Sequence, residues 1–131
     1  MLDEATCAKL ARQLDDARRA RREIEPLHKT FGPFFRPTTP DAYKQISREN
    51  LGKRFDWLDK QLAGKDYLMG KQFTVADAYL FVLTNWTKPT QIDLAKWPNI
   101  QAFNKRVAGR AKVKEAMQFE GLLPKEAERA A

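Results

Sequence analysis

The sequence predicts an all-α protein, a single helical bundle of about five helices, and three observations carry this prediction. Apolar residues recur at spacings of three and four along most of the chain, which is the period of a helix that buries one face. Glycine and proline gather between these periodic segments and punctuate them. The length of 131 residues matches one domain, so an enzyme that needs two domains is excluded unless this chain is only part of it.

The first predicted helix occupies the N-terminal segment and carries an apolar stripe that ends at Phe31. Pro26 lies inside this pattern, and a proline within a helix removes a hydrogen bond at a cost of about 3 kcal/mol. We therefore expect the helix to kink or restart at Pro26. Cys7 begins the stripe and is expected to be an ordinary half-buried thiol. The stripe consists of Cys7, Leu10, Leu14, Ala17, Ile24 and Phe31.

The second predicted helix follows a loop over residues 32–40, which one glycine and three prolines indicate. Thr38 or Thr39 is expected to cap this helix with its side-chain oxygen. Its apolar residues follow the spacing of a core-facing helix, and Gly64 is expected to end it. The stripe consists of Tyr43, Ile46, Leu51, Phe55, Leu58 and Leu62, and the last four have the core-facing spacing.

The third predicted helix begins at a capping box formed by Thr74 and Asp77. In such a box each side chain satisfies a backbone N–H of the first turn, so both residues are assigned a structural role. The helix that follows is apolar on nearly every side as far as Trp86, which predicts a central, buried helix that stops before Pro89.

Two further helices are predicted in the last third of the chain. Pro98 suits the first position of a helix that ends near Gly109. A final helix is expected to run to about Phe119, and residues 124–131 are expected to be a frayed tail.

The composition excludes several classes of protein and of site. Hydrophobic residues make up 43% of the chain and aromatic residues 11%, which argues against disorder. One cysteine and one histidine exclude an internal disulfide and the usual zinc spacings, so no metal is expected. The apolar runs are far shorter than the ~20 residues that span a bilayer, and the acidic start does not resemble a signal peptide. We therefore expect no association with a membrane, and we expect a cytoplasmic location.

The net charge of +7 raises the question of nucleic acid as a partner. The excess is spread along the chain, and its one basic cluster, Arg18 to Arg22, is flanked by acidic residues. Alternating charges on a helix are typical of a solvated face, so nucleic acid is not expected as a partner. A phosphate-binding arm remains the alternative interpretation of this cluster.

From His28 to Leu122 the sequence resembles the C-terminal helical domain of glutathione S-transferases, in particular the bacterial beta class. The matching stretches are LHKTFGPFFRP at 27–37, YLMG at 67–70, FTVADAYLF at 73–81 and WPNI at 97–100. The resemblance assigns residues 27–123 to this helical domain. Residues 1–26 do not resemble the family's corresponding helix and are assigned as a divergent N-terminal helix. The thioredoxin-like domain that precedes the helical domain in this family has no counterpart in the sequence.

The resemblance implies a function, because the family conjugates the thiol of glutathione to hydrophobic electrophiles. The thioredoxin-like domain binds most of the tripeptide, and the helical domain supplies the electrophile pocket and one edge of the glutathione site. By this resemblance His28 is a catalytic residue, and His28 and Lys29 bind glutathione, which is a co-substrate. The residues implied to line the pocket are Phe31, Arg36, Tyr79 and Trp86.

Other interpretations stay open beside this one. Without its thioredoxin-like half the chain is expected to be truncated and weakly active or inactive alone, so it either forms a homodimer or meets a separate thioredoxin-like domain. The alternative function is a non-catalytic protein–protein interaction module of the same fold, which an exposed apolar face would favour. His28 is alternatively a structural residue, and Tyr79 and Trp86, seven residues apart, are alternatively core residues.

Overall fold

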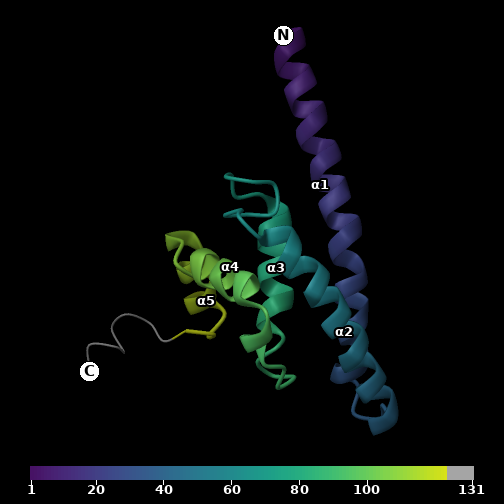
Figure 1. The fold of residues 1–131 in the computed structure, drawn as a ribbon. Helices are drawn as coiled ribbons and strands as arrows, with labels where there is room; N and C mark the ends of the chain where they lie inside the picture. Colours follow the sequence, from purple (N-terminus) through teal and green to yellow (C-terminus); the bar gives the residue numbers. More distant parts are fainter. Residues whose placement is uncertain (124–131) are drawn as a thin grey trace, which may run out of the picture.

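The computed structural model describes residues 1–123, and over this range it is a bundle of α-helices with no strand (Figure 1). The all-α prediction is confirmed, whereas the predicted frayed tail at 124–131 lies outside the described residues. No helix within the described range is long and apolar enough to cross a membrane. The helices are α1 Glu4–Phe31, α2 Asp41–Leu62, α3 Val75–Asn85, α4 Pro98–Ala108 and α5 Ala111–Phe119, with short 3₁₀ helices η1 Gly32–Phe35 and η2 Leu94–Lys96.

Helix α1 passes through Pro26 without interruption, so the predicted restart is wrong. The hydroxyl of Thr30, one turn after the proline, donates a hydrogen bond to the carbonyl of Pro26 at 2.7 Å. Ile24 and Leu27, on either side of the proline, are both buried in the core. Packing on both sides therefore offsets the hydrogen bond that the proline removes.

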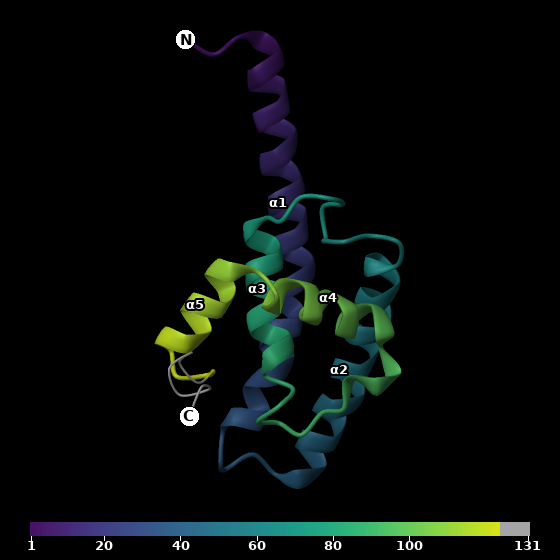
Figure 2. The same ribbon diagram turned by 90° about the vertical axis from the view of Figure 1, so that its left-hand side faces the viewer.

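The N-terminal half of α1 extends beyond the bundle as a single helix (Figures 1 and 2). Asp3 caps it by accepting a hydrogen bond from the Thr6 amide at 2.7 Å. Its first buried residue is Ala20, and Leu14 keeps 51% of its surface exposed. Cys7 is exposed, so the prediction of a half-buried thiol is wrong. The predicted apolar stripe does lie on one helix, but only its C-terminal part meets the core.

Removing residues 1–15 should change the free energy of unfolding by less than about 1 kcal/mol, because this segment contributes no residue to the core. Asp16 would then stand near the new helix start, where an acidic residue is favourable. Urea denaturation measures the change. Removing residues 1–24 is the control, because it also takes Ala20 and Ile24 from the core. This longer deletion should cost about 2 kcal/mol or more, which is what one buried aliphatic side chain contributes. A large loss from the shorter deletion would contradict this account and would indicate that the projecting half is covered in solution.

The segment between α1 and α2 is more ordered than a loop, because residues 32–35 form the 3₁₀ helix η1. Pro40 stands at the N-cap of α2 and Asp41 at its first position, with no side-chain cap. The prediction of Thr38 or Thr39 as the cap is wrong, since both residues lie too early to reach the first amides of the helix. The predicted apolar stripe of α2 is buried from Leu51 to Leu62, but Tyr43 and Ile46 are 54% and 52% exposed, so its first part does not meet the core. Gly64 follows the helix with φ +72°, a conformation that favours glycine.

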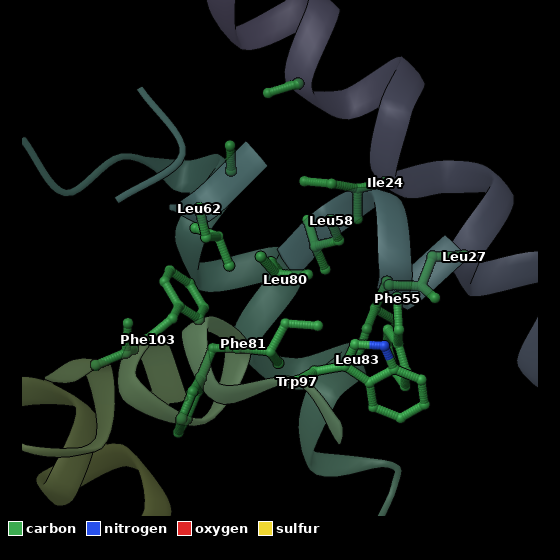
Figure 3. Packing of buried hydrophobic residues seen from close by; sticks show 14 of the residues in the cluster. Ile24, Leu27, Phe55, Leu58, Leu62, Leu80, Phe81, Leu83, Trp97 and Phe103 are labelled. Carbon is green, nitrogen blue, oxygen red and sulfur yellow. The ribbon is translucent and has the colours of Figure 1, made fainter. Parts of the chain in front are cut away.

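The core lies where α1, α2, α3 and α4 meet (Figure 3). Leu80 and Leu83 of α3 have no exposed surface, and neither have Ile100, Phe103 and Val107 of α4. Pro98 occupies the first position of α4, as predicted.

Helix α3 is central, but it is not buried on all sides. Val75 and Val82 are 75% and 50% exposed, so the prediction of a fully buried helix is wrong. They lie seven residues apart and therefore share a helix face. This exposed apolar face of α3 leads to the candidate site.

Candidate functional site

The candidate site is centred on His28, the single histidine, which lies exposed in the last turn of α1. Its Nδ1 atom is hydrogen-bonded to the hydroxyl of Tyr79 on α3, with the two atoms 2.5 Å apart. Its ring forms a T-shaped pair with Trp86 at the end of α3, with ring centroids 5.1 Å apart and planes at 80°. Three residues that the resemblance assigns to the site, His28, Tyr79 and Trp86, are therefore in direct contact.

Trp86 is the residue around which the aromatic side chains gather. Its ring lies 5.6 Å from that of Phe31 and 5.2 Å from that of Phe35, both edge-on. Phe31 has no exposed surface, so it supports Trp86 from the core side. Phe35 is 49% exposed and borders the site on the solvent side. Each edge-to-face pair of this kind contributes about 0.5–1.5 kcal/mol to stability beyond the burial of apolar area. These contacts hold the Trp86 ring in place beside His28.

Sequence reasoning missed Phe35 as a member of this cluster. It follows Phe34, which packs against the core, and in an irregular segment periodicity cannot assign either phenylalanine to a face. The available signal was its position one residue before Arg36, inside the motif at 27–37 that carries the resemblance.

The two predicted basic residues, Lys29 and Arg36, lie on the surface, and the structure does not bring either side chain into contact with this cluster. The Lys29 ammonium is 3.7 Å from a carboxylate oxygen of Glu25 one turn earlier, and both side chains are largely exposed. An exposed pair of this kind contributes little, so the ammonium can exchange its partner for another anion. Arg36 is exposed directly after η1, next to Phe35 in the chain, and its side chain makes no hydrogen bond or ion pair within residues 1–123.

The environment of Tyr79 keeps its hydroxyl protonated. Partial burial raises the pKa of Tyr79, the negative charge of Glu25 raises it further, and the positive charge of Arg21 opposes both. Both charged residues belong to α1, so the helix that holds His28 also sets the electrostatics at Tyr79.

Asp77 fixes the start of α3, the helix that carries Tyr79 and Trp86. Its carboxylate has no exposed surface and accepts hydrogen bonds from the Thr74 amide at 2.8 Å and the Leu68 amide at 2.9 Å. The capping box over Thr74 and Asp77 is therefore present, and it also ties the turn at 67–70 to α3. Within residues 1–123 no group of three metal-ligating side chains comes together.

The surface beside His28 is apolar and open. Val75, Tyr79, Val82 and Trp86 follow one another at spacings of four, three and four, so they share one face of α3. By contrast, a hollow between α1 and the turn at 67–70 is lined largely by charged and polar side chains, including Arg19 and Glu23. A flat apolar molecule matches the α3 face better than this polar hollow. The arrangement can place such a molecule beside the imidazole of His28.

Comparison with known proteins identifies the family of this chain. The model of the family described as "Glutathione S-transferase, C-terminal domain" matches residues 26–111. Glutathione S-transferase GstA of Escherichia coli O157:H7 is 40% identical over 96 residues, which cover 73% of this chain and 48% of that protein. The GST-4.5 protein of Xanthomonas campestris is 38% identical over 103 residues, which are 73% of this chain and 50% of that protein. The chain thus spans about half the length of these curated relatives.

Solved structures give the same result. The bacterial transferase BphK, determined as a ternary complex, superimposes with a TM-score of 0.78 at 40% identity, over 80% of this chain and 53% of that one. A beta class transferase from Sphingomonas chungbukensis gives a TM-score of 0.70 at 37% identity, over 74% of this chain and 48% of that one. The chain therefore belongs to the glutathione S-transferase C-terminal domain family, and its relatives include the bacterial beta class.

Proposed function

We propose that this chain supplies the helical half of a site that conjugates the thiol of glutathione to hydrophobic electrophiles. The observation that carries the proposal is the contact of His28 with Tyr79 and Trp86 beside an exposed apolar face of α3. A relative of this fold has been solved in complex with glutathione, a sphingomonad transferase that is 37% identical to this chain. In this proposal the thiol sulfur lies next to His28, and the electrophile lies over the α3 face.

Each residue has a chemical role in the proposed site. The imidazole of His28 donates a hydrogen bond to the glutathione sulfur and so favours the thiolate, which is the nucleophilic form. Lys29 leaves its weak pair with Glu25 and pairs with a carboxylate of the tripeptide. Tyr79, Val82, Trp86 and Phe35 contact the electrophile, while Phe31 supports this wall from the core and Arg36 borders it. In a substitution, the thiol gives its proton to water, the thiolate sulfur forms the bond to carbon, and the electrophile's leaving group departs with the electron pair of its own bond.

The proposed site needs groups that residues 1–123 do not supply. The family's thioredoxin-like half has no counterpart among these residues, whose named elements are all helices. We therefore propose a separate thioredoxin-like domain as the partner that covers the His28 surface, with a homodimer of this chain as the alternative assembly. The proposed location is the cytoplasm, where an exposed thiol such as that of Cys7 stays reduced.

Titration of the isolated chain tests the proposal. Two probes are compared by NMR: glutathione, and its S-(2,4-dinitrophenyl) conjugate, which carries an aromatic group on the sulfur. The imidazole protons of His28 are unambiguous reporters because the chain has one histidine. Glutathione alone should bind with a Kd no tighter than about 1 mM, near −4 kcal/mol, because most of its contacts are missing. The conjugate should bind more tightly, since its ring buries apolar area on the α3 face.

Val82→Ser and Val75→Ser form a matched pair for this titration. Both change an exposed valine on the same face of α3, but only Val82 lies between Tyr79 and Trp86. Val82→Ser should weaken the conjugate about fivefold, the effect of losing contact with roughly one or two methyl groups. Val75→Ser should leave its affinity unchanged.

Three results would contradict the proposed function. The first is equal affinity for both probes, and the second is equal loss in both valine variants. The third is rapid conjugation of chlorodinitrobenzene by the isolated chain, which would contradict its assignment as half of a site. If neither probe moves the His28 resonances, the interaction module becomes the better interpretation.

A further inference from the structure

The hydrogen bond between His28 and Tyr79 joins two helices through residues 51 positions apart in the sequence. It occupies Nδ1, the ring nitrogen nearer the backbone. The other nitrogen, Nε2, is therefore the one left to interact with a ligand at the exposed surface of the ring. The orientation of the ring decides whether this nitrogen is available to the site.

The aromatic neighbours restrict that orientation. The Tyr79 and Trp86 rings meet the imidazole edge-on, with centroids at 5.8 and 5.1 Å. Trp86 is in turn held between Phe31 and Phe35. A flip of the imidazole would replace Nδ1 by a carbon at the Tyr79 hydroxyl and lose the hydrogen bond, so the packing and the hydrogen bond favour the same ring orientation.

The position of the proton follows from the chemistry of the two groups. A phenol hydroxyl is a stronger acid than a neutral imidazole N–H, and an imidazole nitrogen accepts a hydrogen bond better than a phenol oxygen does. Burial and the charge of Glu25 raise the pKa of Tyr79, so its hydroxyl keeps its proton at neutral pH. The hydroxyl is then the donor and Nδ1 the acceptor. A neutral imidazole with Nδ1 occupied in this way carries its own proton on Nε2.

We propose that Tyr79 is a positioning residue: its hydroxyl holds His28 in the Nε2–H tautomer, so that the imidazole presents a hydrogen-bond donor to the sulfur of a bound thiol. The sulfur as acceptor rests on the proposed function, whereas the tautomer rests on the geometry of the free chain. The resemblance implied only that Tyr79 lines the electrophile pocket. The proposal adds a distinct role for its hydroxyl, since the ring alone would suffice to line a pocket.

The nitrogen-15 shifts of the imidazole test this proposal in the ligand-free chain. The measurement is made at about pH 8.5, where ordinary imidazoles are neutral, and the single histidine gives one set of signals. The unsubstituted chain should show an unprotonated Nδ1 and a protonated Nε2. In Tyr79→Phe, which keeps the ring, the ratio of the Nε2–H to the Nδ1–H tautomer should fall about fivefold, the effect of losing one ordinary hydrogen bond.

Tyr67→Phe is the matched control. It removes a phenol hydroxyl that lies 3.3 Å from a guanidinium nitrogen of Arg110 and has no contact with His28. This variant should keep the tautomer ratio of the unsubstituted chain. A merely structural role for the Tyr79 hydroxyl would change stability without changing the tautomer, so the nitrogen shifts separate the two roles.

Two outcomes would overturn the positioning role: an equal tautomer ratio in Tyr79→Phe and the unsubstituted chain, or a protonated Nδ1 in the unsubstituted chain. This failure is distinguishable from failure of the proposed function. A titration in which neither glutathione nor its dinitrophenyl conjugate moves the His28 signals would overturn the thiol site whatever the tautomer. An unchanged tautomer would overturn the role of Tyr79 whatever the titration gives.

Discussion

Asp77→Ala should reduce the free energy of unfolding by about 3–5 kcal/mol, a large part of the stability of a domain of this size. The Asp77 carboxylate is fully buried and accepts hydrogen bonds from the amides of Leu68 and Thr74, and the Thr74 hydroxyl is within 3.3 Å. Alanine leaves these donors without an acceptor in a buried place, and each such donor costs about 1–3 kcal/mol. Urea denaturation followed by circular dichroism measures the change.

Asp77→Asn should not rescue this loss. The two carboxylate oxygens accept from amides on opposite sides, Leu68 at Oδ1 and Thr74 at Oδ2. An asparagine has one oxygen, so in either orientation its NH₂ group faces one of the two backbone donors. The expected loss of unfolding free energy is about 2 kcal/mol or more, less than in Asp77→Ala because one of the two backbone donors keeps its acceptor.

Asp93→Ala is the matched control for both variants. Asp93 also caps a helix, accepting from the Ala95 amide at 2.9 Å, but it does so at the exposed start of η2. Water can replace the carboxylate there, so the loss should be near 0.5–1 kcal/mol by order of magnitude, the lower part of the range for N-caps. Equal losses at Asp77 and Asp93 would show that the contact with Leu68 contributes nothing.

The fold could be predicted largely because helix periodicity is local. The stripe from Leu51 to Leu62 and the capping box at Thr74 are visible in neighbouring residues, and both appear in the structure. The interruption at Pro26 was a local prediction that tertiary packing overrides, since Ile24 and Leu27 are buried on both sides of it. Periodicity also cannot distinguish an apolar face that meets a core from one left open, and Val82 is a case of the second kind.

The prediction of the candidate site came from the resemblance to the family, which assigned His28, Tyr79 and Trp86 to it. The structure brings these three side chains together. Composition and spacing gave no reason to join a residue of the first helix to one 51 positions later, because such contacts are set by how the helices pack. The contact of Phe35 with Trp86 was missed for the same reason. What sequence reasoning lacked was therefore the pairing of side chains across helices rather than their chemistry.

Asp59→Ala should reduce the free energy of unfolding by about 2–3 kcal/mol, because Asp59 on α2 serves as a cap for a helix far along the chain. Trp97 stands at the N-cap of α4 but offers no side-chain acceptor there. The Asp59 carboxylate takes that place, accepting from the amides of Asn99 at 2.9 Å and Ile100 at 3.0 Å and from the Asn99 side chain at 2.9 Å. Its negative charge also lies at the positive end of the α4 dipole.

A double-mutant cycle with Asn99→Ala separates the cap from the side-chain contact. Asn99→Ala removes the bonds from its side chain to the Asp59 carboxylate and to the Asp59 backbone carbonyl, and it leaves both backbone donors of α4 in place, so it should cost only about 1 kcal/mol. In the Asp59→Ala background the same change should cost less, because the carboxylate is already absent and only the backbone carbonyl remains as a partner. Asp56→Ala is the control on the neighbouring turn. Within residues 1–123 the Asp56 side chain accepts one hydrogen bond, from the Trp97 indole at 2.8 Å, so this change should cost about 1 kcal/mol.

If Asp59→Ala costs no more than Asp56→Ala, the carboxylate does not act as a cap and α4 is held by its apolar face alone. That face buries Ile100, Phe103 and Val107 completely, so it fixes which side of α4 meets the core. Apolar contacts are not directional, however, and leave the position of a helix along its own axis poorly determined. Two amides on one carboxylate determine that position, and α4 in turn packs against α3, which carries Tyr79 and Trp86. The loss at Asp59 should therefore be accompanied by a broadening of the His28 imidazole signals, which Asp56→Ala should leave sharp.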